Sequence, residues 1–321
     1  MKAWFATIFM SLLVFVGAPL AEAETFDCQK PTSPLARLIC GDPVLRAADV
    51  EENELYDTAL SASLDRASLR AEESAWFAAE ILPYNWFAQH DAAINNGEIV
   101  DTYRKREDTL RRITQLWRKL RHNVPGATLA ASCLALPIYP GNGSCSVAAF
   151  AAIEGVPSLH YQLQAYLQPA MQNAVVIFAA TQDQPDAWLP IAVTTSKDAS
   201  LSAPQATASP FGTLLTIASN GTGESDGSAL YRLTTDALED IDDRSWLETL
   251  RSRLPDGLAL SPDIVADYGK MQAVGTVTRS QSSCCTVGSR AIIDLTIEDD
   301  HVAVKGVTFG EPGGSPNDQA N

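Results

Sequence analysis

The chain has 321 residues, and its 39 acidic and 23 basic residues give a formal net charge of −16 at pH 7. From Glu24 to His122 there are 17 acidic and 13 basic residues, whereas from Asn123 to Asn321 there are 21 acidic and 9 basic residues. An acidic surface repels nucleic acid and anionic lipid, and it raises the rate at which a basic protein is encountered. We therefore expect no nucleic-acid partner; the alternative is that the acidity serves solubility.

Residues 1–23 have the layout of a secretory signal peptide. Lys2 supplies a basic start, an apolar run extends from Ala6 to Gly17, and Ala21 and Ala23 are the small residues before the expected cleavage point. The apolar run is shorter than the about 20 residues that a membrane-spanning helix needs. We expect an exported protein, periplasmic or secreted, with no membrane span after cleavage; the alternative is a retained N-terminal anchor.

Six cysteines follow the expected signal peptide. An even number of cysteines in an oxidising compartment indicates disulfide bonds, and their spacing is not that of a zinc site. Cys28 and Cys40 are expected to pair and to join the N-terminal lead to the first helix. For the other four, either Cys133 pairs with Cys145 and the adjacent Cys284 and Cys285 bond to each other, or the two pairs are joined crosswise. No metal or other cofactor is expected.

Residues 24–122 are expected to form a disulfide-stapled helical bundle or hairpin. Ser33-Pro34 is a typical helix start and Gly41 a typical helix end. A second helix should start at Asp42-Pro43, with one mostly apolar face formed by Leu45, Ala48, Glu52, Leu55, Ala59 and Leu64.

The partner of the second helix should be the segment from Leu69 to Leu82, ending before Pro83 because proline cannot continue the hydrogen-bond ladder. A third helix is expected from about Glu98 to Arg121. Its apolar side consists of Tyr103, Leu110, Ile113, Trp117 and Leu120.

This region resembles the N-terminal module of the LprI-type lysozyme-inhibitor family of bacterial envelope proteins. The resemblance covers about a third of the chain after the signal peptide, and it depends on Phe26-Asp27-Cys28, Leu38-Ile39-Cys40, Asp49, Leu55-Tyr56, Leu69-Arg70 and Trp76. It implies an envelope location, a helical bundle and the binding or inhibition of lysozyme, and it brings no catalytic residue. The chain departs from the family near Ser74, where an arginine is usual, and after Trp76, where two further cysteines are usual; this second bridge is either absent or replaced by packing of Trp86 and Phe87.

After residue 122 the pattern changes to short strands punctuated by glycine, proline and serine. Residues 123–310 are expected to form a β-rich, mostly antiparallel domain, and residues 311–321 a disordered tail, so the fold class is α+β. One inserted helix is expected near Arg244 to Leu254; a sandwich, an open barrel and a small propeller remain alternatives. Strands are expected at Leu159–Leu167, Ala174–Ala180, Ala192–Thr195, Gly212–Ala218, Ala229–Leu233, Ala273–Thr278, Asp294–Ile297 and Val302–Phe309.

Residues that could carry chemistry are scattered. The four histidines fit no zinc or nucleophile motif and are expected at the surface or partly packed: His90, His122, His160 and His301. An acidic cluster lacks the spacing of a calcium loop and is expected to be a solvated turn: Asp236, Glu239, Asp240, Asp242 and Asp243. The run Asn220-Gly221-Thr222-Gly223 indicates a hairpin turn.

The leading hypothesis is therefore an exported envelope binding protein without enzymatic activity, which binds or inhibits a lysozyme or another basic envelope protein. The alternative is a non-inhibitory envelope scaffold. A third hypothesis is a wall hydrolase that acts through carboxylates such as Asp242 and Glu248, but such pairs are common in an acidic chain.

Overall fold

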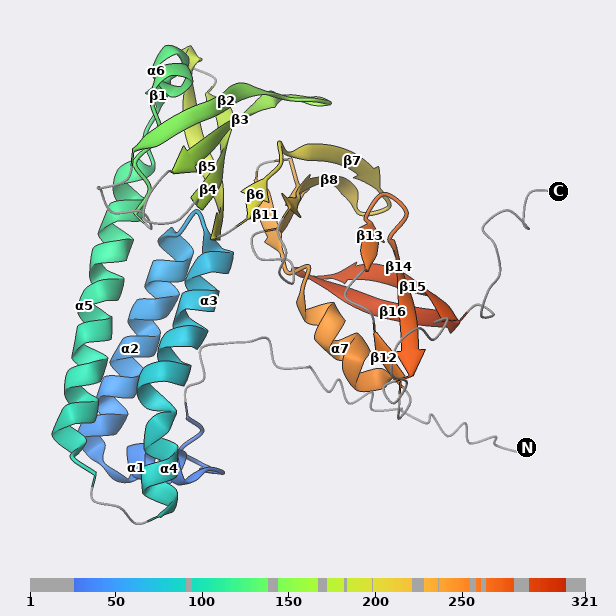
Figure 1. Cartoon of the computed structure of the whole chain (residues 1–321). Helices are drawn as coiled ribbons and strands as arrows, with labels where there is room; N and C mark the ends of the chain where they lie inside the picture. The colour runs from blue at the N-terminus through green and yellow to red at the C-terminus, as the bar shows by residue number, and fades with distance from the viewer. Residues whose placement is uncertain are drawn as a thin grey trace, which may run out of the picture. The chain divides into compact units, whose positions relative to one another are not determined.

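The structure is a computed structural model that describes residues 26–90, 94–137, 144–166, 172–181, 184–197, 199–220, 228–235, 237–254, 258–260, 264–279 and 289–309. The expected signal peptide, the C-terminal tail and the pair Cys284-Cys285 lie outside the described residues. Helices lie mostly in the N-terminal part and antiparallel sheets in the C-terminal part (Figure 1), which confirms the α+β class.

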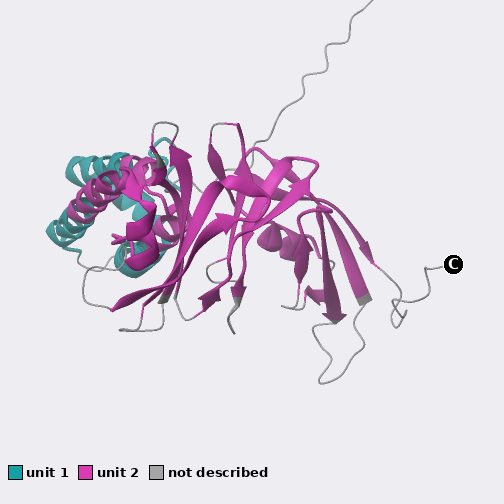
Figure 2. Ribbon diagram, turned by 90° about the horizontal axis from the view of Figure 1, so that it is seen from above, with its two compact units in different colours: residues 1–56, 73–107 teal, residues 57–72, 108–321 magenta. Residues whose placement is uncertain are grey.

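The chain folds into two compact units (Figure 2). Unit 1 comprises Met1–Tyr56 and Glu73–Glu107, and unit 2 comprises Asp57–Glu72 and Asp108–Asn321. Both units are discontinuous in sequence, because the division falls inside three of the helices. The boundary at residue 123 between a helical module and a β-rich domain stays a prediction.

The N-terminal helices begin and end close to where their capping signals predict. Ser33 accepts a hydrogen bond from the Ala36 N–H at 3.0 Å, and a disulfide joins Cys28 to Cys40. Unit 1 has an apolar core from α1, α2, η1 and α5 that includes Ile39, Leu45, Ile81, Ile99 and Tyr103. The helices are α1 (Pro34–Gly41), α2 (Pro43–Ala62), α3 (Arg66–Trp76), the π-helical turn η1 (Phe77–Ile81), α4 (Pro83–Gln89) and α5 (Asn96–Leu120).

One expectation about the end of this region is wrong, and one of two alternatives is excluded. The helical path does not stop before Pro83: the π-helical turn precedes it, and α4 begins at Pro83, because a proline in a first turn lacks only an N–H that has no helical partner. The alternative that packing of Trp86 and Phe87 replaces a second bridge is excluded, because these residues are 57% and 40% exposed and contact each other at a ring-centroid distance of 5.2 Å.

The described residues of unit 2 form three antiparallel sheets of four or five strands and one two-stranded pair. The first has the order β1-β5-β4-β3-β2, the second β11-β10-β8-β7, and the third β12-β14-β15-β16 with β13 beside β14. The first-sheet strands are β1 (Val124–Pro125), β2 (Cys145–Ile153), β3 (Val156–Tyr166), β4 (Gln172–Thr181) and β5 (Gln184–Lys197). The others are β6 (Ser200–Leu201), β7 (Gln205–Ser209), β8 (Gly212–Ile217), β9 (Ser219–Asn220), β10 (Ala229–Leu233), β11 (Leu238–Ile241), β12 (Leu258–Leu260), β13 (Val265–Asp267), β14 (Gln272–Arg279), β15 (Ser289–Glu298) and β16 (His301–Phe309).

Apolar cores join the sheets of unit 2 to one another and to helical residues. The strand β4 is buried on both faces: Val176 and Phe178 pack with helical residues such as Trp117, whereas Val175 and Ile177 pack against the second sheet. A third core lies between the second and third sheets.

The C-terminal region contains one helix more than expected among its described residues. The expected helix is α7 (Ser245–Arg253), whose Trp246 and Leu250 are buried in the third core. The additional helix is α6 (Gly126–Ala131), which packs Leu129 into the first core. A disulfide between Cys133 and Cys145 joins the segment after α6 to β2.

Candidate functional site

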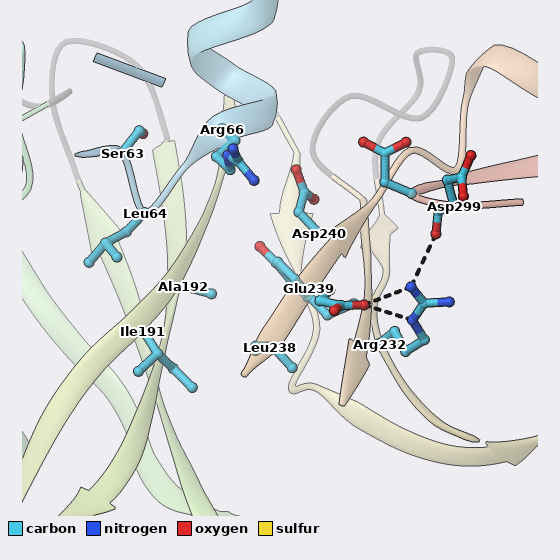
Figure 3. Close-up of a pocket in the computed structure, with 12 residues that line it drawn as sticks. Ser63, Leu64, Arg66, Ile191, Ala192, Arg232, Leu238, Glu239, Asp240 and Asp299 are labelled. Atoms are coloured by element: carbon cyan, nitrogen blue, oxygen red, sulfur yellow. Dashed lines mark hydrogen bonds and ion pairs between the residues drawn. The ribbon is translucent and has the colours of Figure 1, made fainter. Parts of the chain in front are cut away.

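A pocket of about 360 Å³ opens in unit 2 beside the first turn of α3 (Figure 3). The connection between α2 and α3 and the strand β5 form one wall; β10, β11 and the turn between β15 and β16 form the other. The lining residues are Ser63, Leu64, Arg66, Ile191, Ala192, Tyr231, Arg232, Leu238, Glu239, Asp240, Asp299 and Asp300.

Hydrogen bonds fix the first wall of this pocket. The Val193 N–H donates to the Leu64 carbonyl at 2.7 Å, and the Thr195 hydroxyl donates to the Asp65 carboxylate at 2.6 Å. Asp65 also accepts the Ser68 N–H at 3.0 Å, the usual role of a residue before a helix, and burial raises its pKa to about 6. The position of Arg66 at the pocket rim is therefore set by a well-anchored helix start.

Two carboxylates of the opposite wall are already paired with arginines. Arg232 binds Glu239, with Nε donating to Oε2 at 2.8 Å, and Arg70 binds Asp240, with Nη1 donating to Oδ2 at 3.1 Å. Burial raises the pKa of Asp240, and the charges of Arg70 and Arg66 oppose this rise. Because of these ion pairs, β10 and β11 offer a ligand little uncompensated negative charge.

The turn between β15 and β16 supplies the remaining negative charge. Asp299 adopts the left-handed conformation with φ 54°, and its carbonyl accepts Arg232 Nη2 at 3.1 Å. The Asp299 carboxylate has no hydrogen-bond or ion-pair partner among the described residues, and Asp300 Oδ1 lies 3.8 Å from His301 Nδ1. Asp299 and Asp300 can therefore receive a cation, whereas the exposed Arg66 can receive an anion.

The apolar surface of the pocket complements these charges. Leu64 and Ala192 are buried, and Ile191 and Leu238 are half-buried. Lysine and arginine bury their aliphatic stems on such surfaces and keep the charged group against carboxylates. The arrangement suits a basic side chain with an acidic group nearby.

The expectation that the acidic cluster is a solvated turn is wrong. Glu239 and Asp240 lie on β11, and Asp242 accepts the N–H groups of Arg244 and Ser245 at the start of α7. Asp243 is half-buried, and its burial raises its pKa to about 6. Asp236 lies outside the described residues.

The other candidate residues are dispersed in the structure. His90 and His122 are exposed and His160 and His301 half-buried, which confirms the expected surface or partly packed positions. Glu248 is exposed on α7, while Asp242 is engaged by backbone N–H groups. Most of the expected turn at 220–223 lies outside the described residues.

Sequence reasoning missed Asp299, Asp300 and Arg66 as pocket residues. Two adjacent aspartates between strand patterns indicate a hairpin turn, but nothing in the sequence places this turn beside β10 and β11.

Within the described part of the chain, no three or more His, Cys, Asp or Glu side chains are grouped to hold a metal ion. None of the helices found among the same residues has the length and apolar character needed to cross a membrane. No family model, no curated protein and no solved structure matches this chain.

Proposed function

We propose that this protein is an exported binding protein that recognises a basic partner protein through the pocket of unit 2. The observation that carries the proposal is the pair Asp299 and Asp300 at the rim of an apolar pocket, where the neighbouring Glu239 and Asp240 are already neutralised by arginines. Binding of this kind requires no proton transfer by the chain.

The contact proposed is between one lysine or arginine of the partner and this pocket. The aliphatic stem of this lysine or arginine would lie on Ile191 and Leu238, and its charged group would lie between Asp299 and Asp300. Arg66 would pair with an acidic group beside that basic residue. The surrounding negative charge raises the association rate more than it fixes the identity of the partner.

Lysozyme is the proposed partner, and inhibition of the enzyme is the proposed outcome. One support is the resemblance of the N-terminal segment to the lysozyme-inhibitor family. A second is the disulfide between Cys28 and Cys40, which is expected of an exported protein. Another basic envelope protein would satisfy the same pocket chemistry.

The test is a lysozyme turbidity assay with the purified chain lacking residues 1–23. We expect the wild-type protein to slow the clearing of bacterial cell walls, and the Asp299→Asn/Asp300→Asn variant to need about tenfold more protein for the same effect, since each lost charge-assisted contact weakens binding severalfold. Asparagine tolerates the left-handed conformation of Asp299, so the turn should be retained.

The matched control is Glu154→Gln/Asp186→Asn, which removes the same charge from exposed positions of unit 2 outside the pocket. We expect this control to inhibit as the wild type does. An equal loss of inhibition in both double variants would show that inhibition depends on the overall charge and not on the pocket. No inhibition by the wild-type protein would remove lysozyme as the target.

A further inference from the structure

Unit 1 exposes a group of large apolar side chains within six residues. Leu82, Trp86 and Phe87 are 48%, 57% and 40% exposed, and the Trp86 ring stacks on His90 at a centroid distance of 4.5 Å. Apolar side chains that are scattered singly on a surface need no explanation, but exposed aromatic residues in a group mark interaction sites.

A second pocket of about 360 Å³ lies beside this group. Tyr84 and Phe87 from α4 supply two rings whose centroids are 6.4 Å apart, and Glu80 from η1 and Glu98 from α5 supply two carboxylates. The pocket is completed by Ala79, Pro83, Ile94 and Asn95.

The charges of this second pocket are not neutralised by basic residues. The Glu80 carboxylate is exposed and has no partner among the described residues. Glu98 Oε1 accepts a hydrogen bond from the neutral amide of Asn95, with Nδ2 at 3.2 Å. Among the residues that the structure describes, no arginine or lysine lines the pocket.

We propose that this pocket binds an arginine side chain of a partner protein, with an apolar residue next to that arginine packing on Trp86. A guanidinium group stacks on aromatic faces and forms charge-assisted hydrogen bonds to carboxylates, so the two rings and two glutamates match both properties. A purely apolar occupant would leave the two carboxylates without a cation, and an anion would be repelled. The pocket shares no residue with the one in unit 2, and the proposal does not depend on that site.

The local sequence explains how the pocket arises. The π-helical turn Phe77–Ile81 and the restart of the helix at Pro83 place Glu80, Tyr84 and Phe87 on one side. Wider helical turns of this type occur frequently at functional sites.

The experiment is an NMR titration of the full chain without residues 1–23 with the peptide acetyl-Leu-Arg-amide, following the indole N–H of Trp86. The same titration with acetyl-Leu-citrulline-amide keeps the shape of the side chain and removes its charge. We expect millimolar binding of the arginine peptide, at least threefold weaker binding of the citrulline peptide, and a loss of about fivefold in Phe87→Ala and about threefold in Glu80→Gln.

Phe309→Ala and Glu154→Gln are the matched controls, because both residues are exposed and lie in unit 2. They should bind the arginine peptide as the wild type does. Equal affinities for the two peptides, or equal affinities of the Glu80→Gln and Glu154→Gln variants, would overturn the proposal. Because Asp299→Asn/Asp300→Asn leaves this pocket intact, it should not change the titration.

Discussion

A buried group of charged side chains in unit 1 is the feature with the largest expected effect at the scale of single residues. Arg106 donates two hydrogen bonds to Glu73 Oε2, from Nη2 at 2.8 Å and from Nε at 3.1 Å, and lies 5.5 Å from the Trp76 ring centroid. Glu52 is 3% exposed, and its Oε1 has no hydrogen-bond partner among the described residues. Burial and the charge of Glu73 raise the pKa of Glu52 to about 8, against the effect of Arg106.

The stability of the protein should therefore fall as the pH rises from 6.5 to 8.5. The folded state keeps a proton on Glu52 that the unfolded chain has lost above its ordinary pKa, so the stabilising effect of that proton disappears as the pH passes the folded pKa. Asp49, Asp65 and Asp243 have pKa values raised to about 6 and titrate mainly below this window. We expect a loss of about 1–2 kcal/mol in the wild type, or about 2–8 °C in Tm.

Glu52→Gln should remove most of this pH dependence and raise the Tm at pH 8.5, because glutamine is neutral throughout. The measurement is thermal unfolding followed by circular dichroism at pH 6.5, 7.5 and 8.5, with Glu154→Gln as an exposed control. A wild-type Tm that stays constant over this range, or a variant with the wild-type slope, would contradict the assignment.

At the scale of elements, β3 holds α6 and the segment after it through buried glutamines. The Gln162 amide donates to the carbonyls of Leu129 and Ser132, and its Oε1 accepts the N–H of Leu134 at 3.2 Å. Gln164 donates to Gln162 at 2.6 Å and to the Leu134 carbonyl at 3.2 Å. The glutamine side chains thus provide hydrogen-bond partners for the backbone N–H and carbonyl groups of a short irregular segment, as buried polar groups require.

Gln162→Leu should destabilise the protein by about 2–4 kcal/mol, because it leaves several buried backbone groups without partners. The exposed Gln205 provides the control Gln205→Leu, for which we expect a change within about 0.5 kcal/mol. Urea unfolding of both variants measures the difference. A Gln162→Leu variant as stable as the control would show that the segment is held by the Cys133–Cys145 disulfide and apolar packing alone.

The elements that could be predicted from the sequence are those with a long periodic pattern and those that are buried on both faces. The uninterrupted apolar run of β4 and the apolar face of α5 are examples, since both are dictated by burial. The sequence did not predict α6, because Gly126–Ala131 is too short to show a helical period, nor the continuation through Pro83, because proline both ends and starts helices. The pocket residue Asp299 could not be assigned, because its neighbours are set by how distant strands stack.

At the scale of the whole molecule, the excess of acidic residues and the two pockets lead to the same class of partner. The formal net charge is −16, and Asp299, Asp300 and Glu80 each present a carboxylate at the rim of an apolar pocket. Because α2, α3 and α5 contribute to both units, every experiment above uses the full chain without residues 1–23.

Recognition of a basic protein is the central claim, and isothermal titration calorimetry with a basic lysozyme at 25 mM and 150 mM NaCl tests it most directly. Attraction between exposed charges is screened within about 8 Å at the higher ionic strength. We predict measurable binding at both salt concentrations, about tenfold weaker at 150 mM, and weaker for Asp299→Asn/Asp300→Asn than for Glu154→Gln/Asp186→Asn at each. Absence of binding at 25 mM NaCl, or an affinity unaffected by both salt and the pocket variant, would contradict the account.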